Sequence, residues 1–334
     1  MIPKPAALLF GSLCAFACAA EAPPVAPPAG AGYVLPDGSV QIVCFDDLLG
    51  IIGRLDSIFA QAHPGVKFTA RPANNLAALQ TLVFDASALA PVGTDALGGA
   101  AVAYGAIVRG EAFPIRIAHA SLNPAAKLGP LAVIAHPSNP LTHLSVDQVA
   151  RIFTETTRKS NFTHWGQVGV AGGWADGEIH PCGLPWSEHF PSEDAAFGDL
   201  MFMRKLGGGP PVANYDMLPT YAGVVKKVSE DPLALGLTAL NRVTPGVKVV
   251  GLIANAWASP SFGSAEDIVA GRYAFDRYLY IFVRRVPGQP FDPLVREYLR
   301  LVLSPGGQQA IATEPHGYLP LNAVEIGEEQ AKLQ

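Results

Sequence analysis

The chain has 334 residues, of which 49% are hydrophobic and 15% are charged. This is the composition of a folded protein, and the length allows two ordinary domains. The formal net charge of -5 excludes the broad basic surface expected of a nucleic-acid-binding protein.

The N-terminus has the features of an export signal. Lys4 precedes an apolar run that continues to Ala17, and a small-x-small cleavage site follows. We therefore expect a signal peptide over residues 1–20 and a periplasmic or secreted mature chain, with no transmembrane segment. Lipoprotein anchoring at Cys18 is the less favoured alternative, because Phe16 departs from the usual lipoprotein pattern.

The mature chain opens with a segment of unusual composition. Residues 21–37 are rich in Pro, Ala and Gly, which predicts a tether with nothing to bury. The fold should begin near Gly38. A strand over 40–44, apolar positions at helical spacing over 48–59 and a strand over 66–70 then predict a βαβ unit with parallel strands.

Further elements follow in the same alternation. An apolar strand at 131–135 leads to a helix that a capping box of Ser145 and Gln148 should begin. A buried strand is expected over 278–283, and Asp292 before a proline should cap the helix after it. This alternation predicts doubly wound α/β lobes.

Two cysteines remain after the signal, Cys44 and Cys182. A disulfide between them is permitted in an oxidising compartment, and two buried free thiols are the favoured interpretation.

The second unit resembles the periplasmic phosphate-binding proteins of ABC transporters, the PstS type. The telling features are a strand and an Asn-Pro turn, a capped helix that ends in Ile-Phe-Thr, and a Trp-Gly that follows. Later motifs agree in their order, and the resemblance covers about residues 38 to 322. The stretches that carry it are 133–140, 144–154, 165–169, 231–237, 271–283, 303–309 and 317–321.

The resemblance implies a two-lobed periplasmic-binding-protein fold of type II. Each lobe would be a doubly wound, mainly parallel sheet with flanking helices, and a hinge cleft would lie between the lobes. The first lobe would be discontinuous, over 38–128 and 272–325, and 129–271 would form the second. The family function implies a monomer that binds a small molecule or oxyanion in the cleft and delivers it to an ABC permease, without a cofactor.

Three loops are expected to hold the ligand, because strand-to-helix turns aim backbone N–H groups at an anion. They would follow the first strand, a second strand before residue 93, and the strand that ends near Cys182. The candidate ligand-binding residues in these loops are Phe45, Asp46, Asp47, Gly93, Thr94, Asp95, Ser187, His189 and Ser192.

These loops depart from the family pattern. Cys44-Phe45-Asp46-Asp47 stands where Gly-Ser-Asp-Ser is expected, Thr94 stands at an arginine position, and the third loop has no Ser-Gly-Thr. Asp47 is predicted to cap the next helix, and the alternative is that it or Asp46 faces the cleft. Because carboxylates repel an anion, we expect orthophosphate to bind much more weakly than in ordinary family members.

The sequence also allows other classes of function. The degenerate loops also fit a protein that binds a different small ligand or acts as a sensing or partner module. An exported enzyme is less favoured, because no nucleophile or nucleotide motif occurs, and no catalytic residue is predicted. His180, Glu188 and His189 match no metal-binding spacing, so no metal site is predicted.

Overall fold

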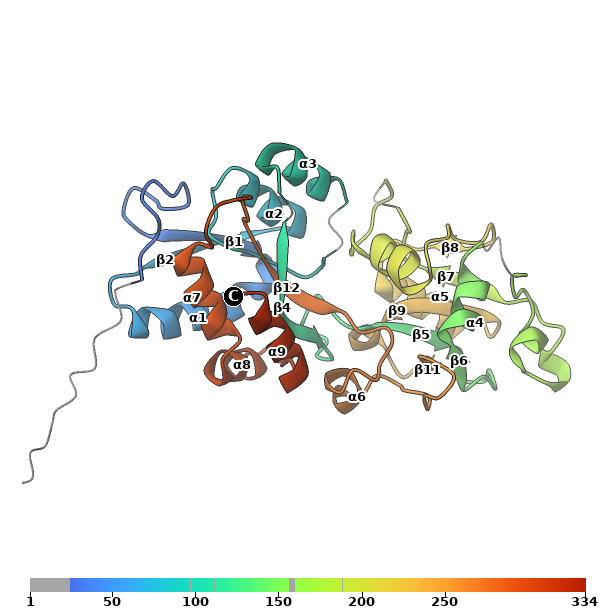
Figure 1. Ribbon diagram of the computed structural model, residues 1–334. Helices are drawn as coiled ribbons and strands as arrows, with labels where there is room; N and C mark the ends of the chain where they lie inside the picture. Colours follow the sequence, from blue (N-terminus) through green and yellow to red (C-terminus); the bar gives the residue numbers. More distant parts are fainter. Residues whose placement is uncertain (1–24, 96–97, 111, 156–159, 188) are drawn as a thin grey trace, which may run out of the picture.

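The described chain forms two lobes that lie side by side, as Figure 1 shows. This arrangement confirms the predicted two-lobed α/β architecture. The predicted signal peptide and Cys18 lie outside the described residues. No helix in the described part of the chain is long and apolar enough to cross a membrane. The computed structural model describes residues 25–95, 98–110, 112–155, 160–187 and 189–334.

The regular elements alternate along the chain, as the sequence predicts. The helices are α1 (Leu49–Ala62), α2 (Asn75–Val83), α3 (Gly98–Val108), α4 (Val146–Phe153), α5 (Tyr221–Glu230), α6 (Ala265–Val269), α7 (Pro293–Val302), α8 (Pro305–Ala312) and α9 (Ala323–Ala331). The strands are β1 (Val40–Phe45), β2 (Phe68–Ala73), β3 (Ala90–Val92), β4 (Phe113–Ser121), β5 (Leu131–Ala135), β6 (His143–Ser145), β7 (His180–Gly183), β8 (Asp216–Met217), β9 (Ala234–Ala239), β10 (Lys248–Val249), β11 (Gly251–Ile253), β12 (Tyr278–Val283) and β13 (Tyr318–Leu319).

Local sequence signals account for several of these boundaries. The Ser145 hydroxyl accepts from the Gln148 N–H while the Gln148 side chain accepts from the Ser145 N–H, so the predicted capping box begins α4. Asp292 caps α7 as predicted, by accepting from the N–H groups of Leu294 and Val295. The βαβ unit is also confirmed, because β1 and β2 pair in parallel across α1.

The sheets are mixed, rather than mainly parallel as predicted. In the first lobe the strand order β13-β4-β12-β3 is antiparallel throughout. In the second lobe, β10-β5-β9 is antiparallel, whereas β7 is parallel to both β9 and β8. The chain crosses between the lobes after β4 and before β12 (Figure 1), and these two strands pair antiparallel inside the first lobe.

Each lobe has a core of its own. One core combines residues between Tyr33 and Leu128 with residues between Leu279 and Leu333, and the other draws on residues from Leu131 to Phe275. The main core of the first lobe is therefore built from both ends of the described chain. A smaller cluster under α2 and α3 completes this lobe.

The tether prediction was wrong at Tyr33. This side chain is buried in the first core, and its hydroxyl donates to Asp292, the cap of α7. Val34 also forms a bridge with Val40 at the start of β1. The folded part therefore begins before Gly38, because the Tyr33 side chain packs into the first core and bonds the cap of α7.

Both cysteines are buried free thiols, which excludes the disulfide alternative. Cys44 lies in the first core and Cys182 in the second, and burial raises the pKa of each thiol to about 12. We expect a thiol-reactive reagent such as DTNB to label neither of them in the native protein at pH 8. Both should react after denaturation, and rapid labelling of the native protein would contradict this packing.

A carboxyl group between α1 and α7 should make stability depend on pH. Asp56 accepts a hydrogen bond from the Tyr298 hydroxyl at 2.7 Å, and burial raises its pKa from 3.8 to about 7. The protonated form therefore favours folding. The contribution of protonated Asp56 to the free energy of unfolding is complete below about pH 4 and is lost as the pH rises towards 7.

The variant Asp56→Asn removes the charge and keeps the acceptor for Tyr298. We expect it to raise the free energy of unfolding at pH 8 by about 1–3 kcal/mol and to have little effect near pH 4. Urea denaturation at the two pH values measures this difference. An equal effect at both would show that the charge on Asp56 is not responsible.

Candidate functional site

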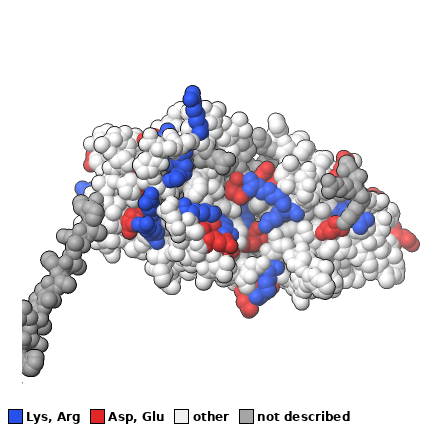
Figure 2. Space-filling view, viewed as in Figure 1, with Lys and Arg blue, Asp and Glu red and all other residues white. Residues whose placement is uncertain are grey.

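A cavity of about 200 Å³ lies where the two lobes meet. The first lobe supplies the turn after β3 and residues of β12, and the second lobe supplies the short helix Asp199–Lys205. Figure 2 shows basic and acidic side chains side by side over this central region. The cavity is lined by Gly93, Thr94, Asp95, Leu200, Arg204, Lys205, Asp276, Arg277, Tyr278 and Tyr280.

The turn after β3 is held close to the first crossing segment. The N–H of Gly93 donates to the Asn75 side chain at 2.8 Å. A Cβ atom on Gly93 would lie only 1.9 Å from a methyl carbon of Leu128, so a larger residue here would displace the Leu128 side chain. Thr94 is buried beside it. The turn thus lines the cavity without a bulky side chain at Gly93.

Arg204 joins the two lobes across the cavity. Its guanidinium contacts the Asp95 carboxylate at 2.6 Å and donates to the Asp95 carbonyl at 2.9 Å. It also forms an ion pair with Asp199 at 2.9 Å, on its own helix. The carboxylate at the second ligand loop is therefore neutralised by an arginine 109 residues away.

A second interlobe contact is deeply buried. Arg277 is 3% exposed; its guanidinium contacts Asp194 of the second lobe at 2.6 Å and donates to the Gly93 carbonyl at 3.1 Å. Asp194 also accepts from the Tyr221 hydroxyl at 2.9 Å. Burial alone would raise the pKa of Asp194, but the charge of Arg277 and these hydrogen bonds lower it. Asp194 is therefore ionised, and the pair holds the lobes together.

Lys205 supplies the third cation of the cavity. Its ammonium donates to the Ala274 carbonyl at 3.0 Å, and burial lowers its pKa. Among the described residues, it forms no direct ion pair with a carboxylate. The cavity lining thus contains three cations (Arg204, Lys205, Arg277) and two carboxylates (Asp95, Asp276). Asp194 and Asp199, outside the lining, pair with the two arginines.

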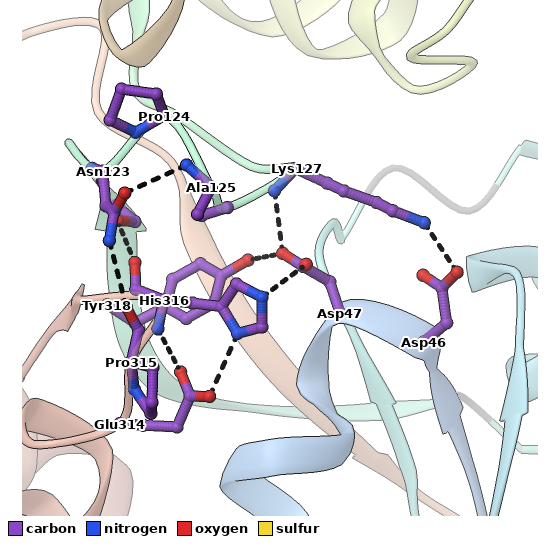
Figure 3. Close-up of polar contacts among 12 residues, drawn as sticks. Asp46, Asp47, Asn123, Pro124, Ala125, Lys127, Glu314, Pro315, His316 and Tyr318 are labelled. Carbon is purple, nitrogen blue, oxygen red and sulfur yellow. Dashed lines mark hydrogen bonds and ion pairs between the residues drawn. The ribbon is translucent and has the colours of Figure 1, made fainter.

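The first predicted loop does not line this cavity. Asp46 forms an ion pair with the Lys127 ammonium at 2.6 Å. The same ammonium lies over the Phe45 ring, 5.7 Å from the ring centroid. Asp47 is buried and accepts from the Lys127 N–H and the Tyr318 hydroxyl, as Figure 3 shows. The prediction that Asp47 caps the following helix was wrong, because it makes no capping bond.

The loop instead fastens the first crossing segment to the C-terminal part of the first lobe. His316 contacts Asp47 at 3.5 Å and Glu314 at 3.0 Å, so its imidazole lies between two carboxylates (Figure 3). Asp47 therefore connects Lys127 of the crossing segment with the turn before β13.

The third loop also differs from its prediction. Ser187 contacts His189 at 2.8 Å, and neither residue lines the cavity. Ser192 accepts from the Asp194 N–H in a local turn and does not line the cavity. The helix begins only after this turn, because Asp194 accepts from the Ala196 N–H and turns its carboxylate to Arg277.

Of the predicted site residues, the structure brings Gly93, Thr94 and Asp95 into the cavity, and it leaves the other six outside it. Sequence reasoning did not assign Arg204 to the ligand site. It did not find Lys205, Asp276 or Arg277. Their signal was weak, because charged residues at the end of a helix or beside a strand are common in any surface.

Known proteins resemble this chain in sequence and in fold. No protein-family model matches the chain. A curated relative, the phosphate-binding protein PstS of Pseudomonas aeruginosa, is 30% identical over 200 residues. That match covers 58% of this chain and 58% of the relative.

The resemblance to PstS-type proteins is confirmed. Two solved structures show the same fold at low sequence identity. PstS from Borrelia burgdorferi has a TM-score of 0.57 at 17% identity, over 85% of this chain and 99% of that one. An ABC-type phosphate transport receptor from Vibrio cholerae has a TM-score of 0.53 at 16% identity, over 84% and 99%. The two-lobed fold is therefore that of PstS-type solute-binding proteins.

Proposed function

We propose that this chain is an exported solute-binding protein, not an enzyme, that takes a small oxyanion into the cavity between its lobes and delivers it to an ABC permease. The observation that carries the proposal is the cavity itself, which combines Arg204, Lys205 and Arg277 with the glycine turn at Gly93. The charged side chains of arginine and lysine are groups that bind oxyanions through charge-assisted hydrogen bonds. The Pseudomonas relative, which is named as a phosphate-binding protein, supports this class of ligand.

The lobes would act in the usual way of a hinged binding protein. The two crossings after β4 and before β12 form the hinge, and we propose that the lobes divide near residues 128 and 272. The Arg204–Asp95 and Arg277–Asp194 pairs join the lobes around the cavity. Binding of a ligand between them would favour the closed arrangement that a permease recognises.

A thermal-shift screen of the mature protein tests the proposal. Phosphate, sulfate, other oxyanions and neutral small molecules would be compared at equal ionic strength, because salt screens charged contacts. An oxyanion present at about 100 times its Kd should stabilise the protein by about 2.7 kcal/mol. Stabilisation by neutral organic molecules alone, with no oxyanion active, would contradict the proposal.

Orthophosphate is expected to bind with a Kd weaker than low micromolar. Arg204 is already paired with Asp95 and Asp199, and Arg277 with Asp194. The anion must compete with these carboxylates, and each charged hydrogen bond that it fails to make lowers the affinity by about 1.5–3 kcal/mol. Calorimetric titration at pH 7 measures the affinity. A low-micromolar or tighter Kd would show that the ion pairs do not oppose binding.

A further inference from the structure

A buried histidine beside the cavity lies between two carboxylates. His119 of β4 is 0% exposed; its Nδ1 lies 2.7 Å from Asp276 and its Nε2 lies 3.0 Å from Glu325 in the first turn of α9. Each of these two contacts needs a proton between nitrogen and oxygen. The three side chains therefore form one proton-sharing unit, in which protonation of one carboxylate affects protonation of the other.

The two carboxylates of this unit are not equivalent. Glu325 is satisfied at both oxygens, because Tyr278 donates to Oε1 at 2.7 Å and the Asn322 N–H donates to Oε2 at 3.0 Å. Asp276 uses Oδ2 for His119, but its Oδ1 is buried and has no hydrogen-bond partner among the described residues. Asp276 is 7% exposed and lines the cavity, so this residue belongs to the proposed ligand site. A buried acceptor without a donor is unfavourable.

The surroundings of Asp276 favour its protonation. Burial raises its pKa and outweighs the opposing effects of His119, the Arg277 N–H and Lys205. The Arg277 guanidinium is engaged by Asp194, and Tyr273 and Tyr278 are neutral neighbours. Lys205 is thus the cavity cation that, among the described residues, forms no direct ion pair with a carboxylate. An anion in the cavity would attract Lys205 and place a second negative charge beside Asp276.

We propose that binding of an oxyanion in this cavity is coupled to uptake of one proton at Oδ1 of Asp276, so that the affinity for the anion rises as the pH falls. The O–H of Asp276 then donates to an oxygen of the anion. Protonation thus removes both the unpaired acceptor at Oδ1 and the repulsion between the carboxylate and the anion. The proton comes from solvent or is carried by a protonated oxygen of the ligand. This inference rests on the proposed function, because it needs the anion in this cavity.

Sulfate and phosphate separate the two sources of the proton. Sulfate does not titrate near neutral pH, so its proton must come from solvent. We expect the Kd of sulfate for the mature protein to be at least about tenfold weaker at pH 8 than at pH 6. Calorimetry in two buffers of different ionisation enthalpy should count close to one proton taken up per sulfate. Phosphate should show a smaller uptake, because it brings protons of its own.

The variant Asp276→Asn should make the Kd of sulfate nearly independent of pH. Asp95→Asn is the matched control: it also removes a cavity carboxylate, but one paired with Arg204, and it should keep the pH dependence. A pH dependence that survives in Asp276→Asn would assign the proton to Lys205 and overturn the inference. So would sulfate binding to the wild-type protein with equal Kd at pH 6 and pH 8, a result that needs no variant.

Failure of the proposed function has a different signature. If neither sulfate nor phosphate binds at any pH between 6 and 8, the oxyanion site itself is contradicted and this inference falls with it. If sulfate binds without proton uptake, the site stands and only the coupling to Asp276 is refuted.

Discussion

Replacing Arg277 by Met should lower the free energy of unfolding by about 3–5 kcal/mol. The substitution leaves the buried Asp194 carboxylate without its guanidinium, and an uncompensated buried charge is strongly unfavourable. It also removes the hydrogen bond from the Arg277 guanidinium to the Gly93 carbonyl, which links the second ligand loop to the Arg277–Asp194 pair. Urea denaturation of the mature protein at pH 7 measures the change.

Two further variants show whether the buried charge is the cause. Arg204→Met removes the other interlobe arginine, whose side chain is 39% exposed, and should cost no more than about 1 kcal/mol. Adding Asp194→Asn to Arg277→Met keeps an acceptor for Tyr221 and removes the unpaired charge, so it should recover at least half of the loss. A loss below about 1 kcal/mol in Arg277→Met would mean that the pair does not hold the lobes together.

Replacing Lys205 by Met should weaken oxyanion binding by about 10- to 100-fold. Lys205 is the cavity cation that can turn to a ligand without breaking an ion pair, and one charged hydrogen bond contributes about 1.5–3 kcal/mol. The methionine keeps the length of the side chain, so the fold should persist. Titration of sulfate or phosphate at pH 6 compares the two proteins.

Lys226→Met provides the matched control for this comparison. Lys226 lies on α5, is 73% exposed and contacts Glu230 at 3.9 Å, so it changes the net charge by the same amount away from the cavity. We expect its Kd to stay within about twofold of the wild type at physiological ionic strength, since salt screens exposed charges beyond about 8 Å. Equal losses in the two variants would point to net charge rather than to the cavity.

Local sequence signals gave a sound account of the fold. The capping box at Ser145 and the Asp292 cap depend on residues three or fewer positions apart, so the sequence alone can reveal them. The mixed direction of the strands was missed. The pairing of β4 with β12 joins residues more than 150 positions apart, and no local pattern records the direction in which such strands run.

The site was predicted less well, for a related reason. The turn at Gly93 follows a strand and could be placed from sequence, whereas the partners of Asp95 and Asp194 come from distant parts of the chain. Arg277 lies 83 residues from Asp194 and Arg204 lies 109 residues from Asp95. The sequence showed carboxylates in the ligand loops and the absence of an arginine expected in the second loop. It could not show which cations from distant parts of the chain line the cavity in the folded protein.

The crystal structure of the mature protein with bound arsenate tests the central claim most directly. Arsenate is a close chemical mimic of phosphate, and the anomalous scattering of arsenic locates it without ambiguity. We predict one arsenate in the cavity between the lobes, in contact with Lys205 and the turn of Gly93, and with Asp276 within hydrogen-bonding distance. An ordered arsenate bound only elsewhere on the chain, with this cavity closed by its own ion pairs, would contradict the account.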